Sequence, residues 1–251
     1  MDDESRQLTT AWLESLERRH LADLTFSEVA RALRALSSCY VERRSKLTDG
    51  GALGTRGKRA AFALYYGPLH FWTVRLVLRE LGRPALGTEH LIDLGCGTGV
   101  AGAAWAMESG AANLSAWDRN AWAVSEANRT YRELALKGRA VQGDAARVPI
   151  RAGRGSGILL AYLLNELADE SRANLRTQLL TAASRGARVL VIEPIARRMA
   201  PWWPGWAEAF AAAGGRADEW RFAADLPRRT RDLGRAAGLD PRELTARSLW
   251  L

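Results

Sequence analysis

The sequence predicts an α/β fold: a mostly parallel sheet with an antiparallel last strand and helices on both faces, preceded by an α-helical N-terminal extension. From residue 90 onward, five short apolar runs alternate with segments that carry helical or capping signals, as in parallel sheets with crossover helices. Before residue 82, apolar residues instead recur at helical spacing. We therefore expect a helical segment over 1–82 and a sheet domain over 83–251.

The N-terminal segment is expected to consist of helices interrupted by one loop. Residues 11–41 and 60–81 show helical spacing, and Thr25 or Ser27 can cap the second helix of the first stretch. Between these stretches, Arg43 to Arg59 is rich in glycine and basic residues and has almost nothing to bury. We expect a mobile loop there, either a solvated connection or a basic flap over an anionic acceptor such as rRNA.

Five parallel strands are expected after the helical segment. They are the runs HLIDLG, NLSAWD, RAVQGD, GILLAY and RVLVIEP. Beyond Pro194, three tryptophans near two prolines precede an alanine-rich helix, and strand-like segments follow at 218–227 and 243–251. These two late strands fit an antiparallel pair that closes the sheet. The tryptophans, Trp202, Trp203 and Trp206, either line a pocket for a flat or cationic small molecule or pack over the sheet edge.

The composition leaves two interpretations of the charge open. The formal net charge is +8, and a basic surface can attract RNA or a phosphorylated acceptor. Lysine, however, occurs only at Lys46, Lys58 and Lys137, which indicates a general bias toward arginine. A solvated arginine-rich surface is therefore the favoured interpretation.

The cysteines and the N-terminus predict a cytoplasmic protein without a structural metal. Cys39 and Cys96 lie far apart in unlike contexts, which predicts neither a disulfide framework nor a zinc site. The first ten residues are acidic and polar, unlike a signal peptide, and no apolar stretch approaches the ~18 residues of a membrane span.

The segment most informative about function is LIDLGCGTGVAG, residues 91–102. An apolar strand runs into a turn with glycines at 95, 97 and 99, which allow a ligand to approach the backbone at a helix N-terminus. Residues 97–102 also satisfy the G-x-G-x-x-G pattern of NAD-binding folds, a weak signal by itself. Asp93 inside the strand distinguishes an NAD site from a site for S-adenosylmethionine (SAM). A carboxylate does not help to bind a pyrophosphate, which is itself an anion, whereas it suits the cationic methionyl end of SAM.

Two further acids follow the next two strands. Asp118 lies where a carboxylate can accept both ribose hydroxyls, and Asp144 lies where it can accept the adenine amine, with the Ala145 N–H reaching the ring. In order and spacing, residues 91–194 resemble the class I SAM-dependent methyltransferases, which have a Rossmann-like sheet. The resemblance implies the following cofactor-binding residues: Tyr66 as a lid, Asp93, Gly95, Cys96, Gly97, Asp118, Arg119, Asp144, Ala145 and Ala161. Core packing is an equal alternative for Tyr66.

The methyl acceptor is expected at the end of the fourth strand, ILLAYLLNEL. The Asn-Pro-Pro-aromatic motif of nucleobase amine methyltransferases is absent there, and the polar groups are Tyr162, Asn165 and Glu166. Glu166 can accept a proton from an N or O nucleophile and Asn165 can orient the acceptor. Alternatively, Asn165 and Glu166 only open the following helix. We place a small organic acceptor slightly ahead of RNA.

A closer resemblance is carried by AYLLNEL, VLVIEP and the helical stretch 60–81. These strings are similar to the mitochondrial and bacterial small-ribosomal-subunit methyltransferase-like assembly family, and the resemblance implies association with the small subunit or its rRNA. The chain lacks that family's Gly-Thr-Pro after Glu193-Pro194 and its C-terminal cysteine cluster. The first alternative is thus a small-ribosomal-subunit assembly factor or rRNA methyltransferase, and the second is an NAD-dependent oxidoreductase.

Overall fold

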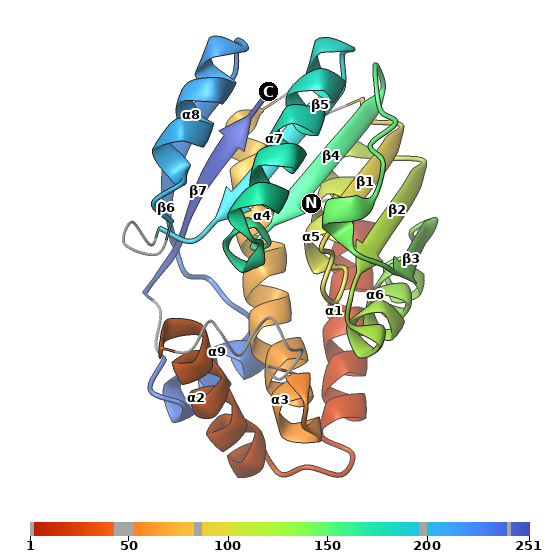
Figure 1. Ribbon diagram of the computed structural model, residues 1–251. Coiled ribbons are helices and arrows are strands. Elements are labelled where there is room, and N and C mark those ends of the chain that lie inside the picture. The colour runs from red at the N-terminus through yellow and green to blue at the C-terminus, as the bar shows by residue number, and fades with distance from the viewer. Residues whose placement is uncertain (1–2, 43–52, 83–86, 196–199, 240–241) are drawn as a thin grey trace. The chain divides into compact units, whose positions relative to one another are not determined.

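The computed structural model describes residues 3–42, 53–82, 87–195, 200–239 and 242–251 (Figure 1). Packing divides the chain into two compact units. The helical unit comprises Met1–Trp72 and Ala223–Leu244, and the sheet unit comprises Thr73–Phe222 and Thr245–Leu251. The expected division into 1–82 and 83–251 stays a prediction, because packing alone does not test which segments fold by themselves.

The helical unit contains α1 (Asp3–His20), α2 (Phe26–Glu42), α3 (Arg56–Ala61), the π-helix η3 (Phe62–Tyr66), the first turns of α4 (Gly67–Leu81) and α9 (Arg228–Ala236). Thr25 caps α2 reciprocally: its backbone N–H donates to Glu28 at 2.7 Å, and its hydroxyl accepts from the Glu28 N–H at 3.3 Å. The buried side chains of Trp12, Leu33 and Phe71 come from three different helices. Each helix therefore contributes an apolar face to one core.

The expected loop over 43–59 is wrong at its C-terminal end. Helix α3 already begins at Arg56, where the Thr55 side chain caps it by accepting from the Lys58 N–H. This local cap outweighs the glycine-rich composition on which the loop prediction rested. Residues 43–52 lie outside the described residues, so the basic flap and its contact with rRNA stay predictions.

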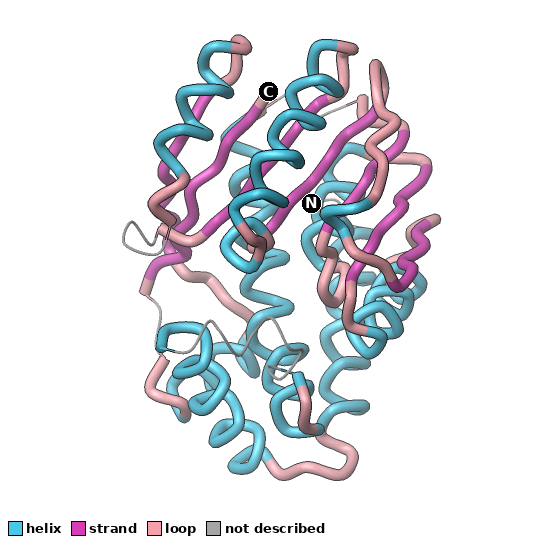
Figure 2. Tube along the Cα trace, in the orientation of Figure 1, coloured by secondary structure: helices cyan, strands magenta, loops and turns pink. Residues whose placement is uncertain are grey.

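The sheet unit is built on seven strands in the order β3-β2-β1-β4-β5-β7-β6 (Figures 1 and 2). In chain order they are β1 (His90–Leu94), β2 (Asn113–Asp118), β3 (Gly138–Gln142), β4 (Ser156–Ala161), β5 (Arg188–Glu193), β6 (Arg216–Ala223) and β7 (Glu243–Trp250). Strands β1 to β5 are parallel, and β7 runs antiparallel to β5. The predicted α/β fold with an antiparallel last strand is confirmed.

Helices cover both faces of this sheet, as its central strands require. Strands β1, β4 and β5 are buried along almost their whole length, which is typical of parallel strands between two helical layers. In Figure 1, α7 (Asp169–Ser184) and α8 (Trp203–Ala212) lie in front of the sheet and α5 (Val100–Ser109) lies behind it. Helix α6 (Ala121–Glu133) packs against α5 and β3. The carboxyl ends of the parallel strands are thereby held at one edge of a rigid layer.

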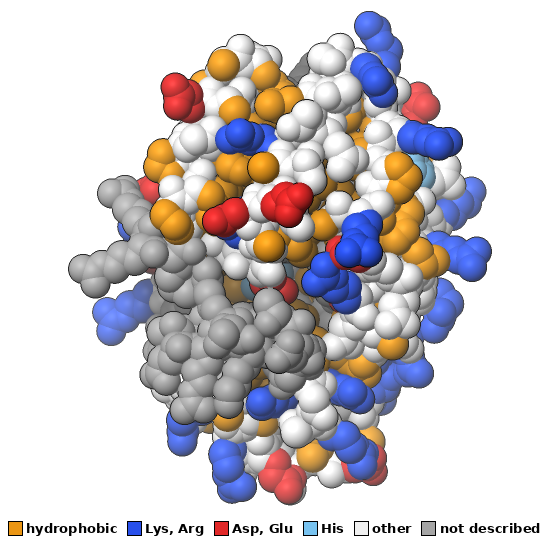
Figure 3. Space-filling view, in the orientation of Figure 1, with side chains coloured by type: hydrophobic (Ala, Val, Ile, Leu, Met, Phe, Trp, Pro, Cys, Tyr) orange, Lys and Arg blue, Asp and Glu red, His pale blue; other side chains and the backbone are white. Residues whose placement is uncertain are grey.

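On the face shown in Figure 3, the Lys and Arg side chains of the described residues lie at many separate places and form no single continuous patch. Within the described part of the chain, no helix combines the length and the apolar character needed to cross a bilayer.

Candidate functional site

The glycine turn after β1 has a backbone that only glycine tolerates well. Gly95, Gly97 and Gly99 all have positive φ, at 73°, 53° and 78°. A Cβ on Gly95 would lie 2.6 Å from Leu163, and one on Gly99 would lie 2.8 Å from the Tyr131 ring. The N–H groups of Gly95 and Cys96 both donate to the Trp117 carbonyl, at 2.9 and 3.0 Å. The turn is therefore fixed against β2, and Leu163, which follows β4, packs directly on it.

Asp93 is buried under this turn with one carboxylate oxygen unused. The side chain is 1% exposed, and Oδ2 accepts from the Gly102 N–H at 3.1 Å. Oδ1 has no hydrogen-bond partner among the described residues. Burial raises the pKa of Asp93 to about 7, and the charge of Asp118 adds to this, against the hydrogen bond from Gly102. A ligand cation or hydrogen-bond donor at Oδ1 would relieve this cost.

A second polar atom of the turn, Thr98 Oγ1, is also buried without a hydrogen-bond partner among the described residues. Thr98 as a whole is 3% exposed. Because buried polar groups are rarely left unpaired, two such atoms next to a glycine cradle fit a polar ligand. The residues present are thus compatible with SAM at the end of β1.

Asp118 lies at the end of β2 and holds the turn from the other side. Its Oδ2 accepts from the Gly97 N–H at 2.8 Å, and its Oδ1 accepts from the Asn120 N–H at 2.8 Å. Each carboxylate oxygen has a further lone pair, so these bonds leave room for ribose hydroxyls. The predicted residues Asp93, Gly95, Cys96, Gly97 and Asp118 therefore come together in one site.

Arg119 and Asp144 also meet, as an ion pair at the ends of β2 and β3. Arg119 Nη2 lies 2.6 Å from Asp144 Oδ2, and Asp144 Oδ1 accepts from the Ala146 N–H at 3.0 Å. Burial raises the pKa of Asp144, but the hydrogen bonds from Arg119 and Ala146 outweigh it and keep the pKa below its ordinary value. Asp144 also caps the short helix η5 (Ala145–Arg147), in which Ala145 is buried. The carboxylate is thus ionised and already oriented by the protein.

Cys96 is a packing residue of the turn. Its thiol is buried, and burial raises its pKa well above the ordinary value, with Asp93 and Asp118 adding to the effect. A thiolate nucleophile needs the opposite shift. Cys96 can therefore line a ligand only as a small neutral group.

The acceptor side of the candidate site begins where β4 ends, at Ala161. Tyr162 follows with φ at 61°, which is unusual for a residue other than glycine, and its N–H donates to the Ile192 carbonyl at 2.8 Å. Burial raises the pKa of the Tyr162 phenol, which a hydrogen bond with Thr73 only partly offsets. The phenol therefore stays protonated and can act only as a neutral group.

The Asn165 amide is held at both ends, by buried Glu193 and by half-buried Trp202. It lies in the short helix η6 (Leu164–Glu166), where its Nδ2 donates to Glu193 Oε2 at 2.6 Å. Its Oδ1 accepts from the Trp202 indole N–H at 3.2 Å. Glu193 Oε1 accepts from the Leu164 N–H at 2.7 Å, so one carboxylate fixes both the backbone and the side chain of η6.

Glu193 and Arg247 support the segment that carries Asn165, and sequence reasoning missed this role. They are register partners on the antiparallel strands β5 and β7, and they are 1% and 2% exposed. Burial raises the pKa of Glu193 to about 7, against the Leu164 hydrogen bond and the charge of Arg247. The Arg247 guanidinium lies 4.0 Å from the centre of the Trp203 ring. The available signal was a charged residue at the end of β5 and another within β7, but only the strand register pairs them.

Glu166 and Tyr66 are the remaining predicted residues, one in each unit. Glu166 is exposed at the end of η6. Tyr66 belongs to the helical unit, where burial raises its pKa against a hydrogen bond with Ser37, so its role as a lid stays a prediction. His70 is half-buried in the same unit beside the Phe62 and Tyr66 rings, and burial lowers its pKa to about 3, so it is neutral.

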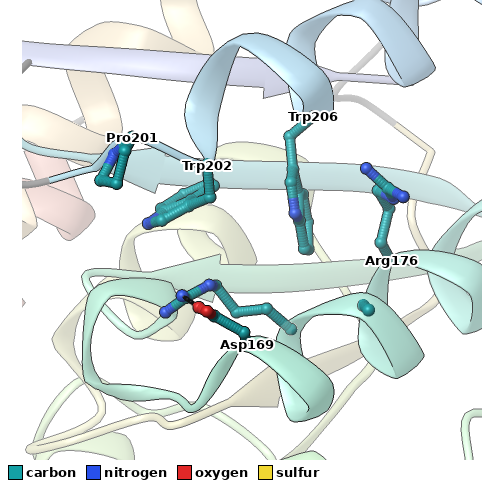
Figure 4. Close-up of a pocket in the computed structure, with 7 residues that line it drawn as sticks. Asp169, Arg176, Pro201, Trp202 and Trp206 are labelled. Carbon is teal, nitrogen blue, oxygen red and sulfur yellow. Dashed lines mark hydrogen bonds and ion pairs between the residues drawn. The ribbon is translucent and has the colours of Figure 1, made fainter.

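The tryptophan-rich segment both packs against the core and borders a pocket. Trp206 is 3% exposed and belongs to the core of the sheet unit, while Trp202 and Trp203 are half-buried against it. Trp202 and Trp206 also line a pocket with Asp169, Arg172 and Arg176 of α7 (Figure 4). Across the described ranges, no group of three His, Cys, Asp or Glu side chains is arranged to hold a metal ion.

Residues 73–151 match the model of the methyltransferase small domain family. No curated protein sequence matches the chain. Similar solved structures include a Nostoc punctiforme protein provisionally assigned as an O-methyltransferase (14% identity, 88% of this chain and 72% of that chain, TM-score 0.53). A second is the Synechocystis magnesium protoporphyrin IX methyltransferase with bound SAM (16% identity, 72% of this chain and 78% of that chain, TM-score 0.46).

A third similar structure is a Pyrococcus horikoshii protein provisionally assigned as an RNA methyltransferase (14% identity, 78% of this chain and 84% of that chain, TM-score 0.42). At these identities the likeness concerns the fold alone. The likeness to the Nostoc protein, together with the strand order, shows that the sheet unit has the Rossmann-like fold of the class I methyltransferases.

Proposed function

We propose that the protein is a SAM-dependent methyltransferase whose cofactor binds along the carboxyl ends of β1, β2 and β3. One observation supports this most strongly: Asp93 Oδ1 is buried beneath a glycine turn without a hydrogen-bond partner among the described residues. A dinucleotide pyrophosphate would bring a second negative charge to this carboxylate, which is unfavourable at low dielectric. A cationic ligand end is attracted by it.

Three acids divide the binding of the cofactor. Asp93 would hold its ammonium group, directly or through water, and Asp118 would hold its ribose hydroxyls. Asp144 would accept from its adenine amine, the Ala145 N–H would reach the adenine ring, and Ala161 would also contact the cofactor. The bound cofactor supplies a methyl group on a positively charged sulfur. Ionised Asp144, already oriented by Arg119, needs little rearrangement on binding.

The residues after β4, Tyr162, Asn165 and Glu166, would align the nucleophile of the methyl acceptor and accept one proton from it. Asn165 is oriented by Glu193 and Trp202, so it can present a fixed hydrogen-bond partner to the acceptor. Exposed Glu166 can accept a proton from an N–H or O–H nucleophile and pass it to solvent. Protonated Tyr162 can donate a hydrogen bond. We place a small organic acceptor ahead of RNA, and a cytoplasmic location and the ribosomal assembly role stay predictions.

Calorimetric titration with SAM, with its demethylated product and with NAD tests the proposal. We expect micromolar binding of the first two and none of NAD. Asp118→Ala should weaken SAM binding by about 1–3 kcal/mol through loss of charge-assisted hydrogen bonds, whereas Glu170→Ala, on the exposed start of α7, should not. Binding of NAD alone would overturn the proposal, and unchanged SAM affinity in folded Asp118→Ala would remove that residue from it.

A further inference from the structure

The pocket beside Asn165 is bounded by aromatic and basic side chains from two segments. Its volume is about 330 Å³, and its lining comprises Asp169, Arg172, Ala173, Arg176, Pro201, Trp202 and Trp206. In Figure 4, the Trp202 and Trp206 rings come from the start of α8 and face the side chains of α7. This size is at the lower end of small-molecule sites and fits one or two fused rings.

The walls of the pocket are held in place before any ligand binds. The Trp202 indole N–H is engaged by Asn165 Oδ1 at 3.2 Å, which fixes the orientation of the ring. Trp202 and Trp206 meet edge to face, with ring centres 5.5 Å apart. Arg172 donates to the carbonyls of Leu164 and Leu167 and lies 5.7 Å from the centre of the Trp202 ring. A flat ligand would therefore meet preorganised apolar surfaces.

The charges of the pocket leave one cation in excess. Arg172 forms an ion pair with Asp169, so these two charges compensate each other. Arg176 uses Nη1 in a hydrogen bond of 3.3 Å to the Gly205 carbonyl, and within the described ranges it forms no ion pair with a carboxylate. Its remaining N–H donors form the planar fork that binds carboxylates. The pocket thus favours an anion over a cation.

We propose that this pocket is a binding site for a small planar carboxylate, with its rings against Trp202 and Trp206 and its carboxylate on Arg176. The site is one side chain away from Asn165, because Trp202 touches both. That the bound carboxylate belongs to the methyl acceptor rests on the proposed function. That the pocket binds a planar carboxylate does not depend on the proposed function.

Three probes with the same rings and different charge test the site on the full chain. They are 2-naphthoate, 2-naphthamide and 2-naphthylmethylammonium, each titrated calorimetrically with and without the demethylated cofactor product. We expect 2-naphthoate to bind about tenfold more tightly than the other two. Arg176→Gln should abolish this preference, while Arg185→Gln, which removes an exposed arginine at the end of the same helix, should preserve it.

The outcomes separate the two proposals. Absent binding of 2-naphthoate, equal binding of all three probes, or the same preference in Arg176→Gln would overturn the carboxylate site. Binding of the demethylated product in that case leaves the proposed function standing. Conversely, Arg176-dependent binding of 2-naphthoate without binding of SAM or its product supports the site and contradicts the proposed function.

Discussion

Two buried carboxylates of the sheet unit, Asp93 on β1 and Glu193 on β5, are satisfied in different ways. Both are 1% exposed, and burial raises the pKa of each to about 7. Glu193 uses both oxygens, on the Leu164 N–H and the Asn165 amide, and faces Arg247 across the sheet. Asp93 uses one oxygen, on the Gly102 N–H.

The difference separates a structural acid from one suited to a ligand. The protein completes the hydrogen bonds of Glu193, so its removal disrupts the segment that it orders. The protein leaves Asp93 Oδ1 without a hydrogen-bond partner among the described residues. The folded state is therefore less stable than it would be with a neutral residue at this position, and such a loss of stability is common at binding sites. Substitutions at the two positions should consequently have opposite effects on stability.

The largest effect is expected from Glu193→Ala. It leaves the Leu164 N–H, the Asn165 amide and the Arg247 charge without their buried partner, which typically costs about 3–5 kcal/mol. Urea unfolding measures the loss, and Glu170→Ala, an exposed acid on α7, should change stability by less than about 0.5 kcal/mol. A loss below about 1 kcal/mol would show that Glu193 does not hold η6.

Asp93→Asn should instead stabilise the protein at high pH. Because burial raises the pKa of folded Asp93 to about 7, the folded wild type binds more protons than the unfolded chain between about pH 4 and 7, and it loses stability as the pH rises through that range. The asparagine variant lacks this loss, so it should be more stable by about 2–4 kcal/mol at pH 8 and nearly equal at pH 4. Its SAM affinity should fall. Equal stability at pH 8 would contradict the burial cost.

Gly102→Ala tests the position of Asp93 without altering its charge. The added Cβ would lie 2.5 Å from Asp93 Oδ2, and we expect overpacking to cost about 1–3 kcal/mol although alanine is the better helix former. SAM affinity should fall with it. Gly110→Ala is the control, because its φ is 69° with nothing within 4 Å of the new Cβ: it should cost stability but leave SAM binding intact. Wild-type SAM affinity in Gly102→Ala would argue against a role for Asp93.

The smallest effect on stability is expected at the exposed ion pair of Arg119 with Asp144. Arg119→Gln removes an ion pair to Asp144 whose arginine side chain is 61% exposed, so stability should fall by less than about 1 kcal/mol. The pKa of Asp144 should rise, which NMR titration of the carboxylate detects. Arg147→Gln, at 3.5 Å from the same oxygen, should raise it less. A stability loss above about 2 kcal/mol would place Arg119 among the structural residues.

The parallel part of the fold could be predicted because its strands are short apolar runs between turn signals. The proximity of Asp93, the glycines and Asp118 was predictable for the same reason, because these residues lie in or directly after neighbouring strands, whose order follows from the chain. Helix α3 was not, because a single cap at Thr55 decided it against the surrounding composition.

The contacts around Asn165 could be predicted only in part. Its place directly after β4 follows from the sequence, but its two hydrogen-bond partners are 28 and 37 residues away in the chain. The pairing of Glu193 with Arg247 depends on the register of antiparallel β5 and β7. Local periodicity contains no information on that register.

Gly102 changes how a familiar sequence pattern should be read. In dinucleotide-binding folds, the third glycine of G-x-G-x-x-G permits close packing of helix on strand. Here the same letter provides the space and the N–H for an acid that stands four residues before the first glycine of the pattern. In other chains with these glycines, an acid at that earlier position predicts the same contact between the third glycine and a buried carboxylate.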